Sequence, residues 1–209
     1  KQVEEYQDRI RLVMALRDGD TDVLKDYKKN TNLDLSGCHS LQNVDGLVNC
    51  TKLTSLNLNN CKDLQNVDGL ANLTKLTNLE LNDCKTLQNV DGLANLINLA
   101  KLNLSNCEVL KNIDSLDNFT NLTRLELRCC YALKNVDSLS NCTNLNSLDL
   151  SIHYEYSSLL ENVDSLANLT NLNSLDLTDC KSIKPKPSQW NMSTRKKVAS
   201  YQERIKKAI

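Results

Sequence analysis

Residues 53–75 read LTSLNLNNCKDLQNVDGLANLTK, and residues 76–98 read LTNLELNDCKTLQNVDGLANLIN. The two stretches agree at 17 of 23 positions, so the chain is built from an internal repeat. The same period extends in both directions. Copies one to seven begin at a degenerate Asn30 and then at Leu53, Leu76, Leu99, Leu122, Leu145 and Leu172. Positions within a copy are numbered 1–23 below.

Each copy has two halves with different apolar spacing. In the first half Leu56 and Leu58 alternate with polar residues, which predicts a short strand with one buried face. In the second half Val67, Leu70 and Leu73 lie three residues apart, which suits a 3₁₀ or short helical turn. An Asp at position 16 opens this turn, and we expect its carboxylate to cap the free N–H groups there. Neither half buries its apolar side alone, so neighbouring copies must stack.

The shared pattern, LxxLxLxxCxxLxN(V/I)DxLxN(L/C/F), resembles the signature of the leucine-rich-repeat family, LxxLxL followed by Asn or Cys. The match covers about residues 30–180. Its short return segment is similar to that of internalin-like bacterial proteins, although here Cys stands where an Asn ladder is usual. The resemblance implies an α/β fold: a curved solenoid with about seven parallel strands on the concave face and 3₁₀ or irregular segments on the convex face.

The two ends are predicted to be helical caps that close the stack. Residues 1–29 form two helices, and residues 184–209 form a helix that begins near Ser193 or Thr194, after two prolines. Residues 30–183 hold the repeats. The predicted inward residues of the caps are Tyr6, Ile10 and Val13 at the start and Val198, Tyr201, Ile205 and Ile209 at the end.

Position 9 holds a cysteine in six of the seven copies. These residues are Cys38, Cys61, Cys84, Cys107, Cys130 and Cys180. Neighbouring rungs of a sheet lie about 4.8 Å apart, but parallel side chains make a poor disulfide torsion, so we expect buried free thiols that donate weakly to neighbouring backbone carbonyls. A row of free thiols favours a reducing compartment, either the cytoplasm or a host cytosol if the protein is a secreted effector.

Charge is distributed unevenly along the chain. Residues 1–180 carry 16 Lys or Arg and 25 Asp or Glu, whereas residues 181–209 carry nine and one. An acidic body argues against a general nucleic-acid binder, and no apolar run is long enough to span a bilayer. The alternative is contact with an acidic membrane or nucleic acid through the C-terminal helix. Its basic residues are Lys196, Lys197, Arg204, Lys206 and Lys207.

Few residues are suited to catalysis or to metal binding. The chain has two histidines, His39 and His153, and it contains neither a glycine-rich phosphate loop nor a nucleophile motif. Cys129, Cys130 and His153 suggest a metal site, but a straight column does not bring three or four ligands together. We therefore predict a chain that is not an enzyme and that uses no cofactor and no metal.

Copies five and six depart most from the repeat. Bulky, charged or aromatic residues stand there at positions where other copies have Ser, Asn or Asp, and copy six carries a four-residue insertion. Tyr and Arg are enriched in binding hot spots. The predicted partner-binding residues are Arg124, Glu126, Arg128, Tyr131, Asp149, Ile152, Tyr154 and Tyr156.

These residues predict a monomer that binds another protein, rather than nucleic acid or membrane, on its concave face. Sequence drift on a solvated surface would explain the same differences between copies. A further alternative is a recognition module of a larger effector or enzyme.

Overall fold

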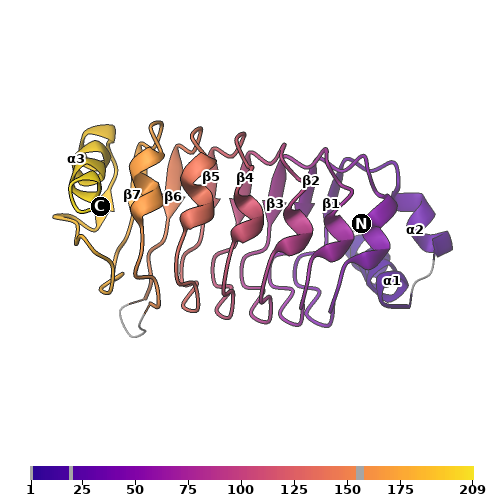
Figure 1. The fold of residues 1–209 in the computed structure, drawn as a ribbon. Helices are drawn as coiled ribbons and strands as arrows, with labels where there is room; N and C mark the ends of the chain where they lie inside the picture. Colours follow the sequence, from indigo (N-terminus) through magenta and orange to yellow (C-terminus); the bar gives the residue numbers. More distant parts are fainter. Residues whose placement is uncertain (1, 19–20, 154–157) are drawn as a thin grey trace.

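The structure, a computed structural model, describes residues 2–18, 21–153 and 158–209. The copies stack side by side into an elongated solenoid with a helical element at each end (Figure 1). Leucines of every copy point inward and form one continuous core along the array. The leucine-rich-repeat solenoid predicted from the 23-residue period is confirmed.

One sheet runs the length of the solenoid, and its strands follow sequence order. The strands are β1 (Asn32–Asp34), β2 (Ser55–Asn57), β3 (Asn78–Glu80), β4 (Lys101–Asn103), β5 (Arg124–Glu126), β6 (Ser147–Asp149), β7 (Ser174–Asp176) and β8 (Asn191–Met192). The first seven are parallel and pair position for position, so Leu56 lies beside Leu79 and Leu79 beside Leu102. The eighth was not predicted. It runs antiparallel to β7 and covers the last edge of the sheet.

Short 3₁₀ turns form the opposite side of the solenoid. They are η1 (Asp45–Asn49), η2 (Asp68–Leu70), η3 (Asp91–Leu93), η4 (Asp114–Leu116), η5 (Asp137–Asn141) and η6 (Asp164–Asn168). The prediction that the Asp caps each turn is wrong. Oδ1 of the Asn two residues earlier accepts the N–H of that Asp, as Asn66 does for Asp68 at 3.2 Å. The Asp carboxylate instead lies in the first turn, where negative charge is favourable.

Position 17 sets how closely neighbouring turns approach. Copies one to three have glycine there, and a Cβ on Gly69 would overlap the carbonyl oxygen of Val44. Copies four to six have serine, whose hydroxyl donates to the carbonyl of the preceding copy, as Ser115 does to Val90 at 2.8 Å. Copies two and three therefore pack backbone against backbone at Gly69 and Gly92, while the serine copies use a side-chain hydrogen bond.

From Cys61 onward the cysteines of position 9 form a buried column, and the predicted weak hydrogen bonds are present, whereas Cys38 of copy one is only partly buried. The Sγ atom of Cys84 donates to the Leu58 carbonyl at 3.3 Å, and Cys107 bonds to Leu81 in the same way. Copy six, which has His153 at position 9, interrupts the series. Cys180 resumes it by donating to the Leu150 carbonyl at 3.0 Å. Each thiol therefore links its own copy to the copy before it.

Two helices, α1 (Gln2–Asp18) and α2 (Thr21–Tyr27), cover the first copy. The apolar face predicted for α1 is wrong in part. Ile10 is 44% exposed and Val13 is only partly buried, whereas Leu12 and Leu16 join the core. The side chain of Tyr6 lies outside what the structure describes.

Helix α3 (Arg195–Lys206) closes the other end by packing on η6, β7 and β8. Val198, Tyr201 and Ile205 are buried as predicted, but Ile209 follows the helix and is 77% exposed. Gln202, a polar residue that the apolar pattern did not single out, is also buried. Its Nε2 donates to the carbonyls of Leu166 and Leu169 at 2.7 and 2.9 Å. These two carbonyls at the last 3₁₀ turn of the repeats therefore have a hydrogen-bond donor.

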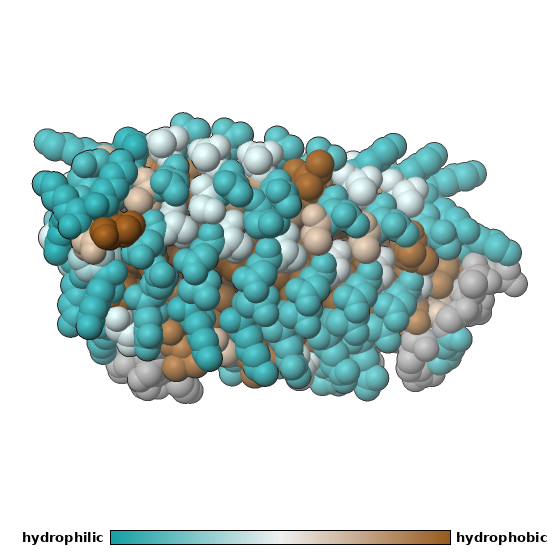
Figure 2. Space-filling model, in the orientation of Figure 1, coloured by the Kyte–Doolittle hydropathy of each residue, from teal (hydrophilic) through white to brown (hydrophobic). Residues whose placement is uncertain are grey.

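The face of the molecule in Figure 2 is mostly hydrophilic, and apolar colour is confined to small separate patches. The large exposed apolar residues are correspondingly scattered over several copies and both caps, including Met14, Ile97 and Leu159. Among the helices that the structure describes, none combines the length and the apolar composition needed to cross a bilayer.

Candidate functional site

The concave face is built from the residues that flank the central leucine of each strand. Leu125 is buried, while Arg124 and Glu126, at positions 3 and 5 of copy five, lie on the outer side of the sheet. Position 7 continues the same face after the strand has ended. Because the register is constant, these three positions form three rows that cross all seven parallel strands.

The row at position 5 has a structural task in most copies. When the residue is Asp or Asn, its Oδ1 accepts the backbone N–H of position 7, as in Asn103 to Ser105 at 2.9 Å and Asp149 to Ser151 at 2.8 Å. We call this series the Asx ladder. Its members are Asp34, Asn57, Asn103, Asp149 and Asp176. Glu80 and Glu126 stand at the same position in copies three and five and are not part of it.

Copy five combines three charged residues on this face. Arg124 pairs with Glu126, with the Nε and Nη2 atoms 2.7 and 2.6 Å from the same carboxylate oxygen. Both side chains are partly exposed, so the pair contributes little to stability but holds the two groups in a defined position. Arg128 is exposed. It makes no ion pair or side-chain hydrogen bond with any residue that the structure describes.

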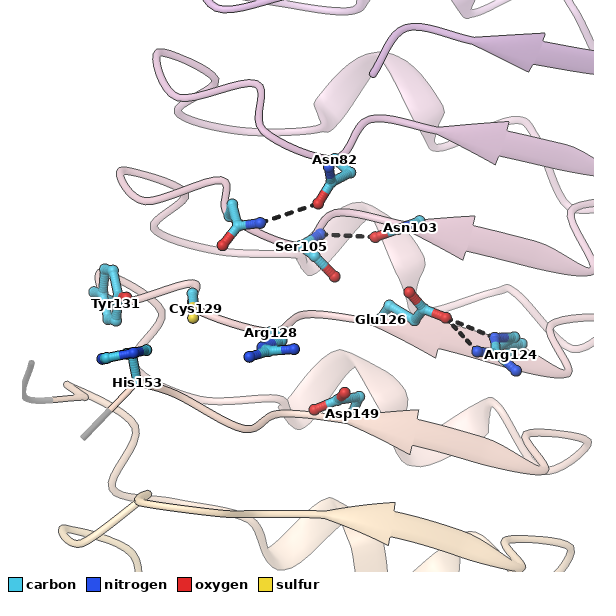
Figure 3. Close-up of a pocket in the computed structure, with 11 residues that line it drawn as sticks. Asn82, Asn103, Ser105, Arg124, Glu126, Arg128, Cys129, Tyr131, Asp149 and His153 are labelled. Carbon is cyan, nitrogen blue, oxygen red and sulfur yellow. Dashed lines mark hydrogen bonds and ion pairs between the residues drawn. The ribbon is translucent and has the colours of Figure 1, made fainter. Parts of the chain in front are cut away.

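A depression of about 660 Å³ lies on this part of the concave face (Figure 3). Its lining comes from copies three to six and is mostly polar. Five predicted residues meet there: Arg124, Glu126, Arg128, Tyr131 and Asp149. The internal comparison of copies had therefore selected residues that share one surface.

The other three predicted residues are not part of this depression. Ile152 is buried, with 6% of its surface exposed, so it is not available to a partner. Tyr154 and Tyr156 lie outside the described residues.

The backbone at position 8 differs between copy six and the other copies. The chain there has a positive φ in every other copy, including 59° at Asn106, 58° at Cys129 and 73° at Gly37. A β-branched residue is strongly disfavoured in that region. Copy six therefore does not repeat the turn, and Ile152 does not occupy the outward place that alignment with its equivalents had assigned to it.

Several lining residues were not predicted. Asn82, Asn103, Ser105 and Asn106 belong to copies three and four, which follow the repeat closely, and His153 belongs to copy six. Selecting the residues that differ between copies could not find the asparagines, because asparagine is common in these rows. They could have been predicted from the repeat numbering, because they occupy positions 5, 7 and 8 of the copies that precede Arg128.

A second depression, of about 800 Å³, lies near the other ends of the same strands. It is lined mainly by Thr and Asn, together with Lys101, Arg124 and Arg195. Arg124 contributes to both depressions. The concave face thus offers two adjoining polar hollows that share this arginine.

The thiols of Cys130, Cys142 and Cys180 lie in the buried core and do not line the depression. Burial raises the pKa of Cys130 to about 12, that of Cys142 to about 11 and that of Cys180 to about 12, so these thiols stay protonated at neutral pH. Across residues 2–18, 21–153 and 158–209, no group of three His, Cys, Asp or Glu side chains is placed to hold a metal ion.

The comparisons with known proteins agree with the repeat. An internalin (inlF) of Listeria monocytogenes is 30% identical with a TM-score of 0.62, and the match covers 78% of this chain and 48% of the internalin. This chain therefore spans about half the length of that protein. A plant peptide hormone receptor, RGFR1, solved in complex with RGF2, is 22% identical with a TM-score of 0.53 over 75% of this chain and 29% of the receptor.

No protein-family model matches the chain, and no curated protein matches its sequence. The assignment rests on the seven in-register parallel strands, the 3₁₀ turns of each copy and the likeness to the internalin. The chain is a leucine-rich-repeat protein and is similar to the internalins.

Proposed function

We propose that the chain binds a partner protein through its concave face, centred on copies five and six. The observation that carries the proposal is the gathering of Arg124, Glu126, Arg128, Tyr131 and Asp149 around one depression. Arg124 and Arg128 replace the small polar residues of most copies, and they lie on one copy together with Tyr131, whereas drift on a solvated face would scatter such departures over the rows. Arginine and tyrosine also provide much of the binding energy in protein interfaces.

The chemistry of the described residues favours binding over catalysis. The depression is open and polar, and an ion pair within it joins Arg124 to Glu126, two residues of the same strand. The plant receptor that shares this fold was solved in complex with RGF2. A folded sheet with outward polar rows provides a rigid surface, so little entropy is lost when a partner binds.

Blocking the concave face is expected to abolish partner capture. Ser147 and Ser174 occupy position 3 on β6 and β7, and Ser147→Arg with Ser174→Arg would place two long side chains over the sheet. Asn95→Arg with Asn118→Arg adds the same charge at exposed residues that follow η3 and η4. We expect proteins captured from a lysate of the producing organism, identified by mass spectrometry, to be lost only with the serine pair. Equal capture by both variants would reject the concave face as the binding surface.

A second candidate function uses the outer side of α3. Lys196, Lys197, Arg204 and Lys207 are exposed and lie on the side of the helix opposite Val198 and its buried neighbours. The acid in this helix, Glu203, bonds to Lys206 at 3.0 Å. The result is a stripe of four cations on a rigid cap, which suits contact with an anionic membrane surface.

Binding to vesicles tests this second function. Vesicles of phosphatidylserine and phosphatidylcholine are expected to bind the protein at low salt, whereas vesicles of phosphatidylcholine alone are not. Lys196→Gln with Lys197→Gln should weaken binding to the acidic vesicles by roughly 30-fold, at about 1 kcal/mol for each lysine. Absence of binding at low salt would remove this candidate and leave the concave face unaffected.

A further inference from the structure

The Asx ladder is interrupted in two copies, and only one interruption is repaired. In copy three, where position 5 is Glu80, the backbone N–H of Asn82 bonds to Oδ1 of Asn59 in the preceding copy at 2.8 Å. In copy five, where position 5 is Glu126, the equivalent N–H belongs to Arg128. No residue that the structure describes accepts a hydrogen bond from it.

The carboxylate of Glu126 does not replace the Asx side chain of the ladder, and it pairs with Arg124 instead. Its Oε1 accepts both contacts from Arg124, at 2.7 and 2.6 Å. Glu126 also carries one methylene more than the Asp or Asn whose Oδ1 reaches the N–H of position 7 in other copies. Copy five therefore presents two unmatched donors from one residue: the N–H and the guanidinium of Arg128. Arg128 is exposed, so its donors are available to a ligand.

The neighbouring copies add further donors to the same depression. The Oδ1 of Asn103 is occupied by the Ser105 N–H, and the Oδ1 of Asn82 accepts the side chain of Asn106 at 3.1 Å (Figure 3). Their amide NH₂ groups donate to none of the described residues. Because both side chains line the depression together with Arg128, the wall towards copies three and four offers donors.

Of the two carboxylates that line the depression, one is paired with a cation and the other accepts hydrogen bonds from its own copy. Glu126 is paired with Arg124, and Oδ1 of Asp149 accepts the N–H and the hydroxyl of Ser151 at 2.8 and 2.6 Å. Asp149 also belongs to copy six, on the opposite side of Arg128 from Asn103. An acceptor that enters from the copy-four side therefore meets Arg128 and the amide donors first. A carboxylate suits this set because an arginine fork binds its two oxygens together.

We infer that this depression binds a carboxylate of the partner protein, with Arg128 as its anchor and the NH₂ group of Asn103, in the adjacent copy, as a further donor. The inference rests on the proposed function, since it names the group that the concave face recognises. An Asp or Glu side chain and a free chain terminus carry the same chemistry. Either source fills the vacant acceptor position that Glu126 leaves in the Asx ladder.

Selection from a random peptide library tests the inference without knowledge of the natural partner. A library displayed with free C-termini is selected against the wild-type protein, and the best peptides are synthesised. We expect them to share an acidic residue or to require the free C-terminus. Replacing Asp or Glu by its amide, or amidating the C-terminus, distinguishes these sources, and the effective change should weaken binding about 10- to 100-fold.

Matched variants distinguish a direct contact with Arg128 from the general effect of positive charge on peptide binding. Arg128→Gln is expected to weaken the same peptides about 10- to 100-fold, whereas Lys101→Gln removes an equal charge from the same face outside this depression and should change binding less than threefold. Arg128→Lys keeps the charge but not the fork and should fall between them. Arg128 is exposed, so thermal melts of all three variants should match the wild type.

Two outcomes would overturn the inference. One is a set of peptides with no shared carboxylate, and the other is an equal loss of binding in Arg128→Gln and Lys101→Gln. Neither outcome bears on lysate capture by the serine-to-arginine pair. The proposed function would then stand while its carboxylate specificity fails.

Discussion

Between pH 8 and pH 10 the protein is expected to lose most of its stability. Burial raises the pKa of the core thiols above that of an unfolded cysteine, to about 12 at Cys130 and Cys180 and about 11 at Cys142, and in the same direction at Cys61, Cys84 and Cys107. The folded state thus keeps protons that the unfolded chain releases above about pH 9. The stabilisation is complete below that pH and is lost as the pH rises towards the folded pKa values.

The effect is large because the thiols act together. Each contributes roughly 1–2 kcal/mol by pH 10, so six of them reach a total similar to the whole free energy of unfolding of a domain. Urea denaturation with reductant at pH 8, 9 and 10 measures the loss. A variant with Cys84→Ala, Cys107→Ala and Cys130→Ala should lose about half as much per pH unit. An identical slope in both proteins would show that the column does not drive the loss.

Gly69→Ala is expected to destabilise the repeats by about 3 kcal/mol or more, while Gly46→Ala should cost about 1 kcal/mol or less. A Cβ on Gly69 overlaps the backbone of Val44 and Asp45, which can move only if two whole copies separate. A Cβ on Gly46 meets the ends of the Leu16 and Leu24 side chains at 2.8 Å, and these can rotate away.

Denaturant midpoints of the two glycine variants make the comparison directly. Because both substitutions add the same methyl group at the same repeat position, helix propensity and unfolded-state effects cancel between them. Ser115→Ala serves as a reference for the other kind of packing and should lose about 1 kcal/mol with its hydrogen bond to Val90. Equal losses at Gly69 and Gly46 would mean that the turns do not pack backbone against backbone.

The repeat could be predicted because its signal recurs and each recurrence is independent. Every copy places Leu at positions 4 and 6, so seven weak patterns reinforce one another and identify seven strands. Features that occur once had no such support. Strand β8 is two residues long, and α1 carries two competing apolar faces, of which docking against η1 selected Leu12 and Leu16 over Ile10. The contact between α1 and η1, which the sequence pattern does not show, therefore determines which face of the helix is buried.

The candidate site was predictable where side chains depart from the repeat and not where the backbone does. Arg124, Glu126 and Arg128 replace small polar residues in outward rows, so internal comparison found them. Ile152 was misplaced because an alignment carries no φ value and could not show that position 8 needs a left-handed backbone. The donors of Asn82 and Asn103 were hidden for another reason. Only the hydrogen-bond partners of their Oδ1 atoms show which end of each amide is available.

The antiparallel strand β8 limits how this protein can change in length over evolution. It pairs with β7, and Trp190 beside it accepts the Leu177 N–H through its carbonyl oxygen at 2.7 Å, so the terminal edge offers no free parallel register. A duplicated copy added after Ile183 would have to displace β8 and α3 together. A copy duplicated between β2 and β4 would meet neighbours almost identical to itself. The array is therefore expected to grow or shrink from its interior, with both caps unchanged.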